Sequence, residues 1–456
     1  MKHTVHEKQS KLNMFNNEGE VEMKRVPCSG CSLLCDDIII RSDGIFIDEV
    51  VGACIKGKEH FDQVTAKNRI TDPMFRENNN LKKIDWKQGY DKAIELINKA
   101  KNPLLYGFST VSCEAQLKAI QLAEKINGHI DSNSSICQGK LIEKSKSVGL
   151  TLTTIGEVIN KVDLIILWGA NAAESIPRLL NKALFSRGKF RMTGREIKTL
   201  IIIDPVQSAS FGVMGVRDLS LIIEPNKDID LIRVLKEECC TADSIPSEGV
   251  AGIDGDDLKR LLLHLTGAEY GVIFVGQGLL KPTDDTDTLQ EFLELIEMIN
   301  SRQKKGRISL IMMGGHYNMT GFDHVALANY GQNGSLNFAN NQLEDTKTNT
   351  IDKIKNEDFD LSIIVGTDPI SHLPANLSSK LMKHPIIVID NKKSATGDVA
   401  DLFLPSAITG IECGGLAYRL DHIPIELQKI INSPNNIPSD EEILTELLKR
   451  LTDGGP

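Results

Sequence analysis

Short continuous apolar runs, separated by longer amphipathic stretches, dominate the chain from about residue 85 onward. A strand that is covered on both faces has this pattern, because neither face meets water. The stretch CEAQLKAIQLAEKINGHI has the apolar spacing of an amphipathic helix that ends near Gly128. The runs are NPLLYGFST, VDLIILWG, KTLIIID, LSLIIEP, GVIFVGQG, RISLIMMGG, DLSIIVG, HPIIVID and ADLFLPS. Together they predict a doubly wound α/β chain with parallel sheets.

An internal repeat divides this α/β region into two related, Rossmann-like halves. The matched positions, each pair 197 residues apart, are Asp163 with Asp360, Gly169 with Gly366 and Pro177 with Pro374. Soon after each copy a strand ends in aspartate, at Asp204 and at Asp390, and a further Asp-Leu strand follows. We therefore expect two copies of one nucleotide-binding-type unit, with the remaining strands inserted between them.

Polar and glycine residues just past these strand ends are candidates for ligand binding, because ligands of such folds lie at the carboxyl ends of strands. Glycine lets a ligand approach the backbone closely, and backbone amides can meet phosphates. Asp204 and Asp390 suit a ribose or guanine contact. The remaining candidates are Gly169, Asn171, Gly366, Thr367 and Asp368. Glycine and aspartate also punctuate strand ends without binding anything, but two copies in register favour two dinucleotide-like ligands, or one ligand with two such arms.

Four cysteines near the start of the chain follow the spacing C-x2-C-x3-C-x18-C, at Cys28, Cys31, Cys35 and Cys54. This spacing is typical of a [4Fe–4S] cluster or of a four-cysteine zinc site. Zinc ribbons usually pair two C-x2-C knuckles, and here a single cysteine returns, which favours iron–sulfur over zinc and over packing alone. Lys56 is either a solvated charge or a contact between the cluster and a second redox group.

The predicted domain boundaries follow chain order. Around the cysteines, IIIRSDGIFIDEVVGACIKG predicts a β-hairpin that turns at residues 42–44 and delivers Cys54. The expected parts are a disordered extension (1–24), an iron–sulfur module (25–66), a first α/β ligand-binding region (67–225), an inserted α/β region (226–350), a second α/β ligand-binding region (351–425), and a C-terminal helix and tail (426–456).

Composition narrows the class of protein. The chain has 456 residues, a net charge of −10 and a pI near 5.6, which argues against nucleic acid as the main partner. No apolar run reaches the roughly 18–20 residues that span a bilayer, and the first 24 residues have no signal-peptide core. Four of nine cysteines stand in a metal pattern, so a reducing, cytoplasmic compartment is expected. Cys113, Cys239, Cys240 and Cys413 lack metal spacing and are expected to be packing or surface thiols.

A four-cysteine module, two related α/β halves and a lone loop cysteine, Cys137, resemble the molybdopterin or tungstopterin oxidoreductases. Within them the chain is most similar to the B-subunit family of formylmethanofuran dehydrogenases, over roughly residues 26–425. The segments that carry this resemblance are PCSGCSLLCDDI, GACIKG, SICQGKL, TIGEVINKVDLIILWGANAAESIPR, LIIIDP, GGHYNMTGF, VGTDPISHLP and GDVADLFLPSAITGIECGGLAYRLDHIPI.

The resemblance implies cofactors and an activity. The four module cysteines would hold a [4Fe–4S] cluster, Lys56 would lie between cluster and pterin, and Cys137 would bind tungsten or molybdenum between two pyranopterin guanine dinucleotides. The activity implied is reversible reduction of CO2 to formate, the first step of methanogenesis from CO2. The implied partners are an amidohydrolase-like A subunit, a C subunit, ferredoxin-like subunits and a small β-barrel D subunit, which would replace the C-terminal barrel domain that larger family members carry and this chain lacks.

Two departures from the family pattern bear on turnover. Gln138 follows the metal-ligand cysteine where histidine is expected, and Gly314 stands where arginine is expected before Gly-His-Tyr-Asn. An amide can orient substrate but cannot act as an acid or base. His316 is then a candidate proton relay, or a structural histidine. The alternatives are a redox-inactive scaffold subunit of a formyltransferase/hydrolase complex, although such relatives lose the cluster cysteines, and another pterin enzyme such as a formate dehydrogenase.

Overall fold

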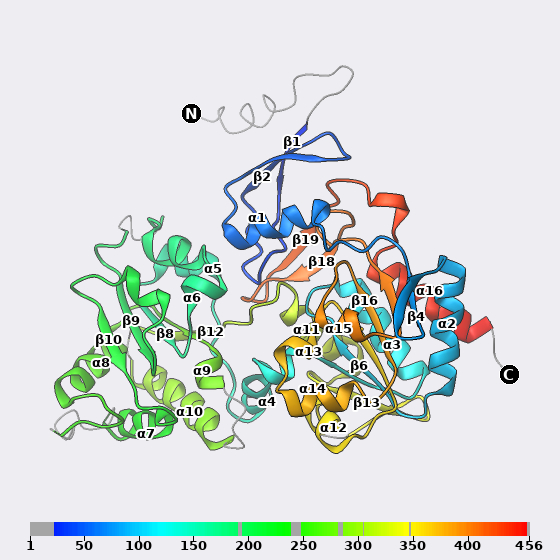
Figure 1. Ribbon diagram of the computed structural model, residues 1–456. Helices are drawn as coiled ribbons and strands as arrows, with labels where there is room; N and C mark the ends of the chain where they lie inside the picture. Colours follow the sequence, from blue (N-terminus) through cyan, green and yellow to red (C-terminus); the bar gives the residue numbers. More distant parts are fainter. Residues whose placement is uncertain are drawn as a thin grey trace.

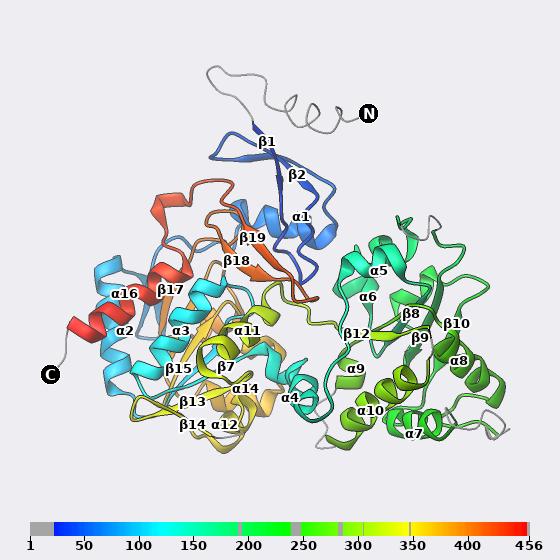
Figure 2. The same cartoon turned by 180° about the vertical axis from the view of Figure 1, so that it is seen from behind.

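The computed structural model describes residues 22–189, 194–238, 248–280, 286–303, 305–345 and 348–453. Two α/β bodies lie side by side, and a small N-terminal module sits above the junction between them (Figures 1 and 2). Within the described residues, no helix is both long and apolar enough to cross a membrane.

The N-terminal module is a three-stranded antiparallel sheet followed by helix α1. Its elements are β1 (Glu22–Val26), β2 (Ile38–Ser42), β3 (Ile47–Val51) and α1 (Ile55–Asp62). The predicted hairpin is confirmed: β2 pairs antiparallel with β3, and Asp43 Oδ1 accepts hydrogen bonds from the backbone N–H groups of Ile45 and Phe46 at 2.8 and 2.7 Å. The expected disordered extension is wrong at residues 22–24, because they pair with β2 as part of β1; residues 1–21 lie outside the described part.

The body that we call half one is built on a five-stranded parallel sheet in the order β10-β9-β8-β11-β12. Every residue of β8, β11 and β12 is buried, which is why these strands read as continuous apolar runs. Its elements are α5 (Ile155–Lys161), β8 (Leu164–Trp168), α6 (Ala172–Ser175), β9 (Thr199–Asp204), β10 (Leu219–Ile222), α7 (Asp228–Glu238), α8 (Gly255–Gly267), β11 (Gly271–Val275), α9 (Gln277–Leu280), α10 (Thr286–Arg302) and β12 (Ile308–Met312).

The second body, half two, has a nine-stranded sheet in the order β14-β13-β7-β6-β15-β16-β17-β4-β5. Its five central strands are parallel, and antiparallel strands extend both edges. The strands are β4 (Met74–Glu77), β5 (Asn80–Lys83), β6 (Pro103–Gly107), β7 (His129–Ser132), β13 (Leu336–Ala339), β14 (Gln342–Glu344), β15 (Leu361–Val365), β16 (Ile386–Asp390) and β17 (Leu402–Pro405). The predicted mixture of parallel sheets and helices is therefore confirmed for both bodies.

Several helices begin at side-chain caps that the sequence supplies, among them α2, α3, α5, α8, α12 and α15. At the start of α2, Asp85 Oδ1 accepts from the Gln88 backbone at 2.8 Å, and Gln88 Oε1 accepts from the Asp85 backbone at 3.1 Å, which is a capping box. The helices of half two are α2 (Trp86–Lys99), α3 (Cys113–Lys125), α11 (Met319–Tyr330), α12 (Thr350–Asn356), α13 (Pro369–His372), α14 (Ala375–Leu381), α15 (Ala395–Val399) and α16 (Asp440–Asp453).

Three further segments join the parts. Helix α4 (Gly139–Val148) lies between the two halves, and the hairpin of β18 (Gly415–Tyr418) and β19 (Pro424–Leu427) lies between half two and the N-terminal module (Figure 1). The chain returns from half one to half two through the segment 313–318, which connects β12 to α11.

The internal repeat is structural. The order β10-β9-β8-β11-β12 of half one corresponds strand for strand to β17-β16-β15-β6-β7 of half two. Asp163 accepts from the backbone N–H groups of residues 269 and 270, both at 2.9 Å, at the entrance to the neighbouring strand. Asp360 does the same for residues 101 and 102, at 2.7 and 2.9 Å. The repeated aspartate therefore ties two adjacent parallel strands together at their starts.

The expected boundaries of the two α/β regions do not follow the sheets. Strands β11 and β12 lie in the expected inserted region 226–350, yet they complete the sheet of half one. Strands β6 and β7 lie in the expected first region 67–225, yet they pair in the sheet of half two. Half one is thus inserted as a unit between β7 and β13 of half two. Sheet pairing depends on neighbours in space, whereas the predicted boundaries followed chain order.

Candidate functional site

Each half has a cavity at the carboxyl ends of its parallel strands. The half-two cavity measures about 670 Å³ and the half-one cavity about 700 Å³. Residues of the half-two cavity used below are Ser29, Lys56, His60, Gly366, Thr367, Asp368, Asp390 and Asp440. Residues of the half-one cavity used below are Asn133, Cys137, Gly169, Asn171, Ser175, Asp204 and Gln277. Gly315, His316 and His372 line both. The strand-end candidates predicted from the repeat are therefore divided between two corresponding cavities.

Gly169 and Gly366 make the same left-handed turn at the ends of β8 and β15, with φ of 58° and 60°. A Cβ added to Gly169 would lie 2.4 Å from the backbone N of Leu279, and one added to Gly366 would lie 2.3 Å from Thr110 Oγ1. Because both the conformation and the space exclude a side chain, the repeat requires glycine at these positions.

In the half-one cavity, Asn171 and Asp204 flank the turn. Asn171 Oδ1 accepts from Ser210 Oγ at 3.0 Å. Asp204 Oδ1 accepts from the backbone N–H of Val206 at 3.0 Å, and burial raises the pKa of this carboxyl above its usual value. Both side chains keep acceptor capacity for a ligand's donors.

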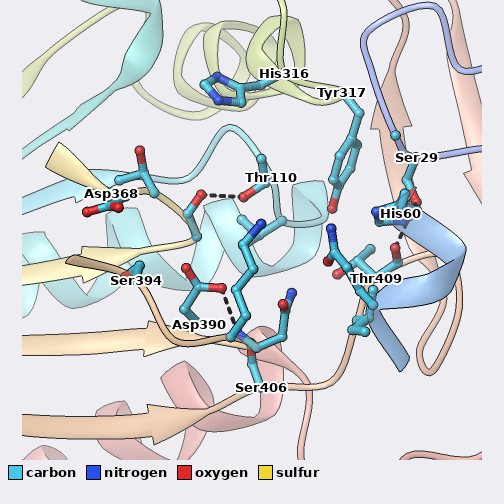
Figure 3. Close-up of a pocket in the computed structure, with 18 of the residues that line it drawn as sticks. Ser29, His60, Thr110, His316, Tyr317, Asp368, Asp390, Ser394, Ser406 and Thr409 are labelled. Carbon is cyan, nitrogen blue, oxygen red and sulfur yellow. Dashed lines mark hydrogen bonds between the residues drawn. The ribbon is translucent and has the colours of Figure 1, made fainter. Parts of the chain in front are cut away.

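In the half-two cavity, Asp368 and Asp390 have different roles (Figure 3). Asp368 accepts from Ser371 Oγ at 2.6 Å and from the backbone and hydroxyl of Thr396 at 2.9 and 2.6 Å. Burial acts to raise the pKa of Asp368, but these hydrogen bonds lower it on balance. Asp368 therefore holds the loop together. Asp390 accepts from the Asn391 backbone at 2.6 Å, and burial raises its pKa to about 6. Asp390 keeps more hydrogen-bonding capacity for a ligand than Asp368 does.

The predicted site residues leave out a carboxylate and a hydrogen-bonded pair that line the half-two cavity. Asp440, at the start of α16, is buried, and burial raises its pKa to about 7. In sequence it is one of several acidic residues at a helix start, which gives no signal of a site. Ser29 Oγ donates to the Thr409 carbonyl at 2.9 Å and lies 2.7 Å from His60 Nε2 (Figure 3). Because a hydroxyl has one proton, His60 Nε2 donates to Ser29.

The four module cysteines lie together at the base of the N-terminal module. A Cβ added to Gly57 would lie 3.2 Å from Cys28 Sγ and 4.0 Å from Cys54 Sγ, so this glycine keeps the space between thiols clear. Burial raises the pKa of Cys28 to about 12; a hydrogen bond from Gly30 lowers it, and the neighbouring thiols raise it. Among the residues that the structure describes, no group of three or more His, Cys, Asp or Glu side chains is placed so that it could hold a metal ion. Of the other thiols, Cys113 is buried, Cys413 is half-buried, and Cys239 and Cys240 lie outside the described residues.

Cations from half one reach this module. Arg178 makes a bidentate ion pair with Asp37 at 2.6 and 2.7 Å, and Lys182 lies 3.3 Å from the same carboxylate. Burial raises the pKa of Cys35, and the charges of Arg178 and Lys182 oppose this shift. A thiolate is therefore less unfavourable at Cys35 than it would be at a thiol buried among apolar groups alone.

Lys56 connects the module to both cavities. Its side chain lines the half-two cavity, and its Nζ donates to the carbonyl of Ser175 at 2.9 Å. Ser175 in turn lines the half-one cavity. Lys56 therefore contacts the linings of both cavities; its position between a cluster and a pterin, and its role in redox contact, stay predictions.

Cys137 lies in the wall of the half-one cavity, and the residue is 4% exposed. The polar loop expected around it is instead a short 3-10 helix, Asn133–Ile136, that runs into α4. Two buried carboxylates hold this turn: Asp131 accepts from Ser135 Oγ, and Asp323 accepts from Ser134 Oγ at 2.8 Å. Burial raises the pKa of Cys137 to about 11, and hydrogen bonds from Gln277 and from the Gln138 backbone oppose the shift.

Gln138 is buried behind the Cys137 turn, outside the residues that line either cavity. Its Nε2 donates to Thr320 Oγ1 at 3.4 Å and to Asp323 Oδ2 at 3.3 Å. Its Oε1 would lie only 2.9 Å from a Cβ added to Gly314. The two departures from the family pattern thus contact each other. A substrate-orienting role for Gln138, expected from the sequence, has no support in this position, whereas His316 lines both cavities.

Comparison with known proteins agrees with this geometry. The sequence profile of the molybdopterin oxidoreductase family matches residues 69–450. The B subunit of tungsten-containing formylmethanofuran dehydrogenase 2 from Methanocaldococcus jannaschii is 30% identical over 94% of this chain and 98% of its own length. The protein with the same description in Methanococcus maripaludis gives the same identity and coverage.

Two solved structures share the fold. One is a chain of the formyltransferase/hydrolase complex (FhcABCD) from Methylorubrum extorquens in complex with methylofuran, with a TM-score of 0.65 and 18% identity over 84% of this chain and 99% of that chain. The other is acetylene hydratase from Pelobacter acetylenicus, with a TM-score of 0.69 and 12% identity over 94% of this chain and 69% of that chain. With the family profile and the two B-subunit relatives, the evidence is sufficient: the chain belongs to the molybdopterin oxidoreductases and, within them, to the B-subunit family of formylmethanofuran dehydrogenases.

Proposed function

We propose that the chain is the catalytic subunit of a formylmethanofuran dehydrogenase-like complex and reversibly reduces CO2 to formate, the first step of methanogenesis from CO2. One observation carries this proposal. Two structurally equivalent cavities, one per half, meet at His316, and Cys137 opens into one of them. With one dinucleotide in each cavity, Cys137 would hold the metal that the two dinucleotides share.

The residues present fit two pyranopterin guanine dinucleotides. Acceptors at corresponding strand ends, Asp204 in half one and Asp390 in half two, suit the donors of a guanine base or a ribose. Asp440 adds a second carboxylate in half two. Cys137 would ligate tungsten or molybdenum, for which a soft thiolate is suited. When bound, the metal–pterin group supplies the two-electron chemistry, and the chain positions the reactants and shields them from water.

We assign Cys28, Cys31, Cys35 and Cys54 to a [4Fe–4S] cluster that exchanges electrons with this centre through the region of Lys56. Ligation requires thiolates, and burial keeps the Cys28 and Cys31 thiols protonated at neutral pH, with pKa values of about 12 and 11. Cluster binding must therefore release protons. Arg178 and Lys182 reduce the cost of negative charge at Cys35.

The partners that we propose are those of the family: an amidohydrolase-like A subunit that condenses formate with methanofuran, a C subunit, a small β-barrel D subunit and ferredoxin-like electron carriers. We place the complex in the cytoplasm, because the seven described cysteines form no disulfide, and the four assigned to the iron–sulfur cluster suit a reducing compartment.

A redox-inactive scaffold in a formyltransferase/hydrolase complex is the second candidate. The packing of Gln138 against Gly314 favours it, since both family residues expected there are missing. The presence of Cys137 in a cavity wall and of all four module cysteines favours the enzyme.

Elemental analysis of the anaerobically purified native complex separates the two candidates. Iron, tungsten, molybdenum and zinc are counted per copy of this chain, and CO2/formate activity is measured with an artificial electron carrier. About one tungsten or molybdenum per chain, with activity, supports the enzyme. A folded, intact complex that contains neither metal refutes the proposal and assigns the chain to the scaffold class.

A further inference from the structure

Two histidines lie where the cavities meet. Among the residues that the structure describes, only Gly315, His316 and His372 line both cavities. Both histidine side chains are open to the cavity space. They come from different elements, His316 from the segment that joins β12 to α11 and His372 from the end of α13. An imidazole there can exchange a proton with a group in either cavity.

The backbone around His316 is fixed by all three parts of the molecule. Met313 donates to the Val275 carbonyl of half one at 2.8 Å, and Asn318 donates to the Ser109 carbonyl of half two at 3.0 Å. From the cysteine module, Ser32 donates to the Gly315 carbonyl at 3.3 Å. Because the neighbours on both sides of His316 are held, its imidazole is presented from a rigid support, as an oriented acid–base group requires.

His372 is fixed at the end of the Gly366 turn. Its ring packs against Tyr106, with ring centroids 6.2 Å apart. Tyr106 Oη accepts from Asn133 Nδ2 at 3.3 Å, and Asn133 belongs to the turn that carries Cys137. The position of His372 is therefore tied through two side chains to the turn of the expected metal ligand.

Burial favours the neutral form of both rings in the cofactor-free chain. Burial lowers the pKa of His316 to about 4, and the positive charges of His372, Lys56 and Lys392 lower it further. Burial also lowers the pKa of His372, while the neighbouring Asp368 acts to raise it. An anionic dinucleotide in these cavities would oppose the lowering of both pKa values, because an opposite charge stabilises the imidazolium.

We propose that His316 and His372 form the proton-transfer pair of this site, which takes over the role that Gln138 cannot perform. The inference rests on the proposed function. In the direction of reduction, CO2 gains two electrons, supplied by the reduced electron carrier through the redox centres, and one proton, supplied by the His316 imidazolium, to form the C–H bond of formate. His372 returns a proton to His316. In the reverse direction, His316 accepts the proton that formate releases and His372 passes it on.

The neighbouring side chains explain why this task falls to the pair. Gln138 lies behind the Cys137 turn, its amide is bound to Thr320 and Asp323, and it has no titratable proton near neutral pH. His60 also lines the half-two cavity, but its Nε2 is bound to Ser29, and it lies outside the residues that line the half-one cavity.

The test compares His316→Gln and His372→Gln with the control His264→Gln, in the native complex purified anaerobically. The control changes a half-buried histidine of α8, outside both cavities. Glutamine keeps the size and polarity of the side chain but cannot carry the proton. We expect about 100-fold slower CO2/formate turnover in His316→Gln, the usual size of a lost acid–base group, with unchanged tungsten, molybdenum and guanine dinucleotide content. We expect the double variant to be little slower than His316→Gln, because groups acting in one relay are not additive.

A readout independent of turnover follows the pKa of each histidine in the intact complex, by deuterium exchange at the imidazole Cε1–H with peptide mass spectrometry. His372→Gln should raise the pKa of His316, since it removes a neighbouring positive charge, and His264→Gln should leave that pKa unchanged. Wild-type turnover in both cavity variants, or an unchanged His316 pKa in His372→Gln, overturns the pair and leaves the proposed function standing. A wild-type complex without tungsten, molybdenum or turnover overturns both.

Discussion

Gly169 and Gly366 occupy equivalent turns, but they meet different neighbours, so alanine should affect them differently. At Gly366 the added Cβ meets the Thr110 hydroxyl, which donates to the Gly366 carbonyl at 2.5 Å. The left-handed φ costs alanine about 1 kcal/mol, and loss of this hydrogen bond costs about 1 kcal/mol more. We therefore expect Gly366→Ala to destabilise the strand end by about 2 kcal/mol.

At Gly169 the added Cβ meets main-chain atoms, 2.4 Å from the N of Leu279 and 2.6 Å from the Cα of Gly278. No side chain can rotate to relieve this contact. Besides the φ cost of about 1 kcal/mol, displacing a packed segment costs about 1–3 kcal/mol. Gly169→Ala should therefore cost about 2–4 kcal/mol, with the α9 turn displaced, and should reduce ligand occupancy in the half-one cavity.

Hydrogen–deuterium exchange of peptides that cover β8 and β15 measures these local costs, and it does not require the whole chain to unfold in one step. A cost of 2 kcal/mol speeds exchange about 30-fold. Thr110→Ala provides the decisive control. Alone it should cost about 1 kcal/mol, but added to Gly366→Ala it should cost almost nothing, since that hydrogen bond is already lost. Full additivity in this cycle, or a larger increase of exchange at β15 in Gly366→Ala than at β8 in Gly169→Ala, would show that the neighbours of the two turns do not set these costs.

Two further outcomes are expected. Cys137→Ala should abolish CO2/formate activity and lower tungsten or molybdenum content while iron per chain stays unchanged; full activity would remove Cys137 from the mechanism. Asp440→Asn should reduce the loss of stability between about pH 4 and pH 7, because burial raises the pKa of Asp440 in the folded chain to about 7. In this window the folded state binds more protons than the unfolded state, so stability falls as pH rises. Thermal unfolding midpoints of the wild type and of Asp440→Asn at pH 5 and pH 7.5 test this. The same difference between the two pH values in both proteins would contradict a raised pKa of Asp440.

Features that depend on a few adjacent residues could be predicted from the sequence. The continuous apolar runs became buried parallel strands, because a strand covered on both faces has no polar positions to show. The repeated Asp-Leu runs and the glycines that follow them marked equivalent turns, because the left-handed φ requires glycine at the same place in each copy. The hairpin of the N-terminal module was predicted from its turn residues for the same local reason.

The arrangement of those pieces depends on tertiary structure. The repeat was visible, but its boundaries were not, because β6 and β7 complete a sheet with β15, more than 200 residues later in the chain. Nothing local distinguishes Asp440 from its acidic neighbours; docking of α16 on half two places it in a cavity wall. Gln138 is adjacent to Cys137 in sequence, yet the turn carries one side chain into the cavity and the other against Gly314.

The elements, the repeated turns and the spacing of the cysteines are properties of the sequence alone, since they depend on backbone preferences and on residues close in the chain. Which strands pair, and which side chains share a cavity, depends on how the halves pack in three dimensions. His316 and His372 are 56 residues apart and belong to unlike segments. They line the same space because half one is inserted into half two, and the segment that carries His316 leads the chain back from half one to half two. Such contacts follow from the packing of whole sheets and helices, which no short stretch of sequence specifies.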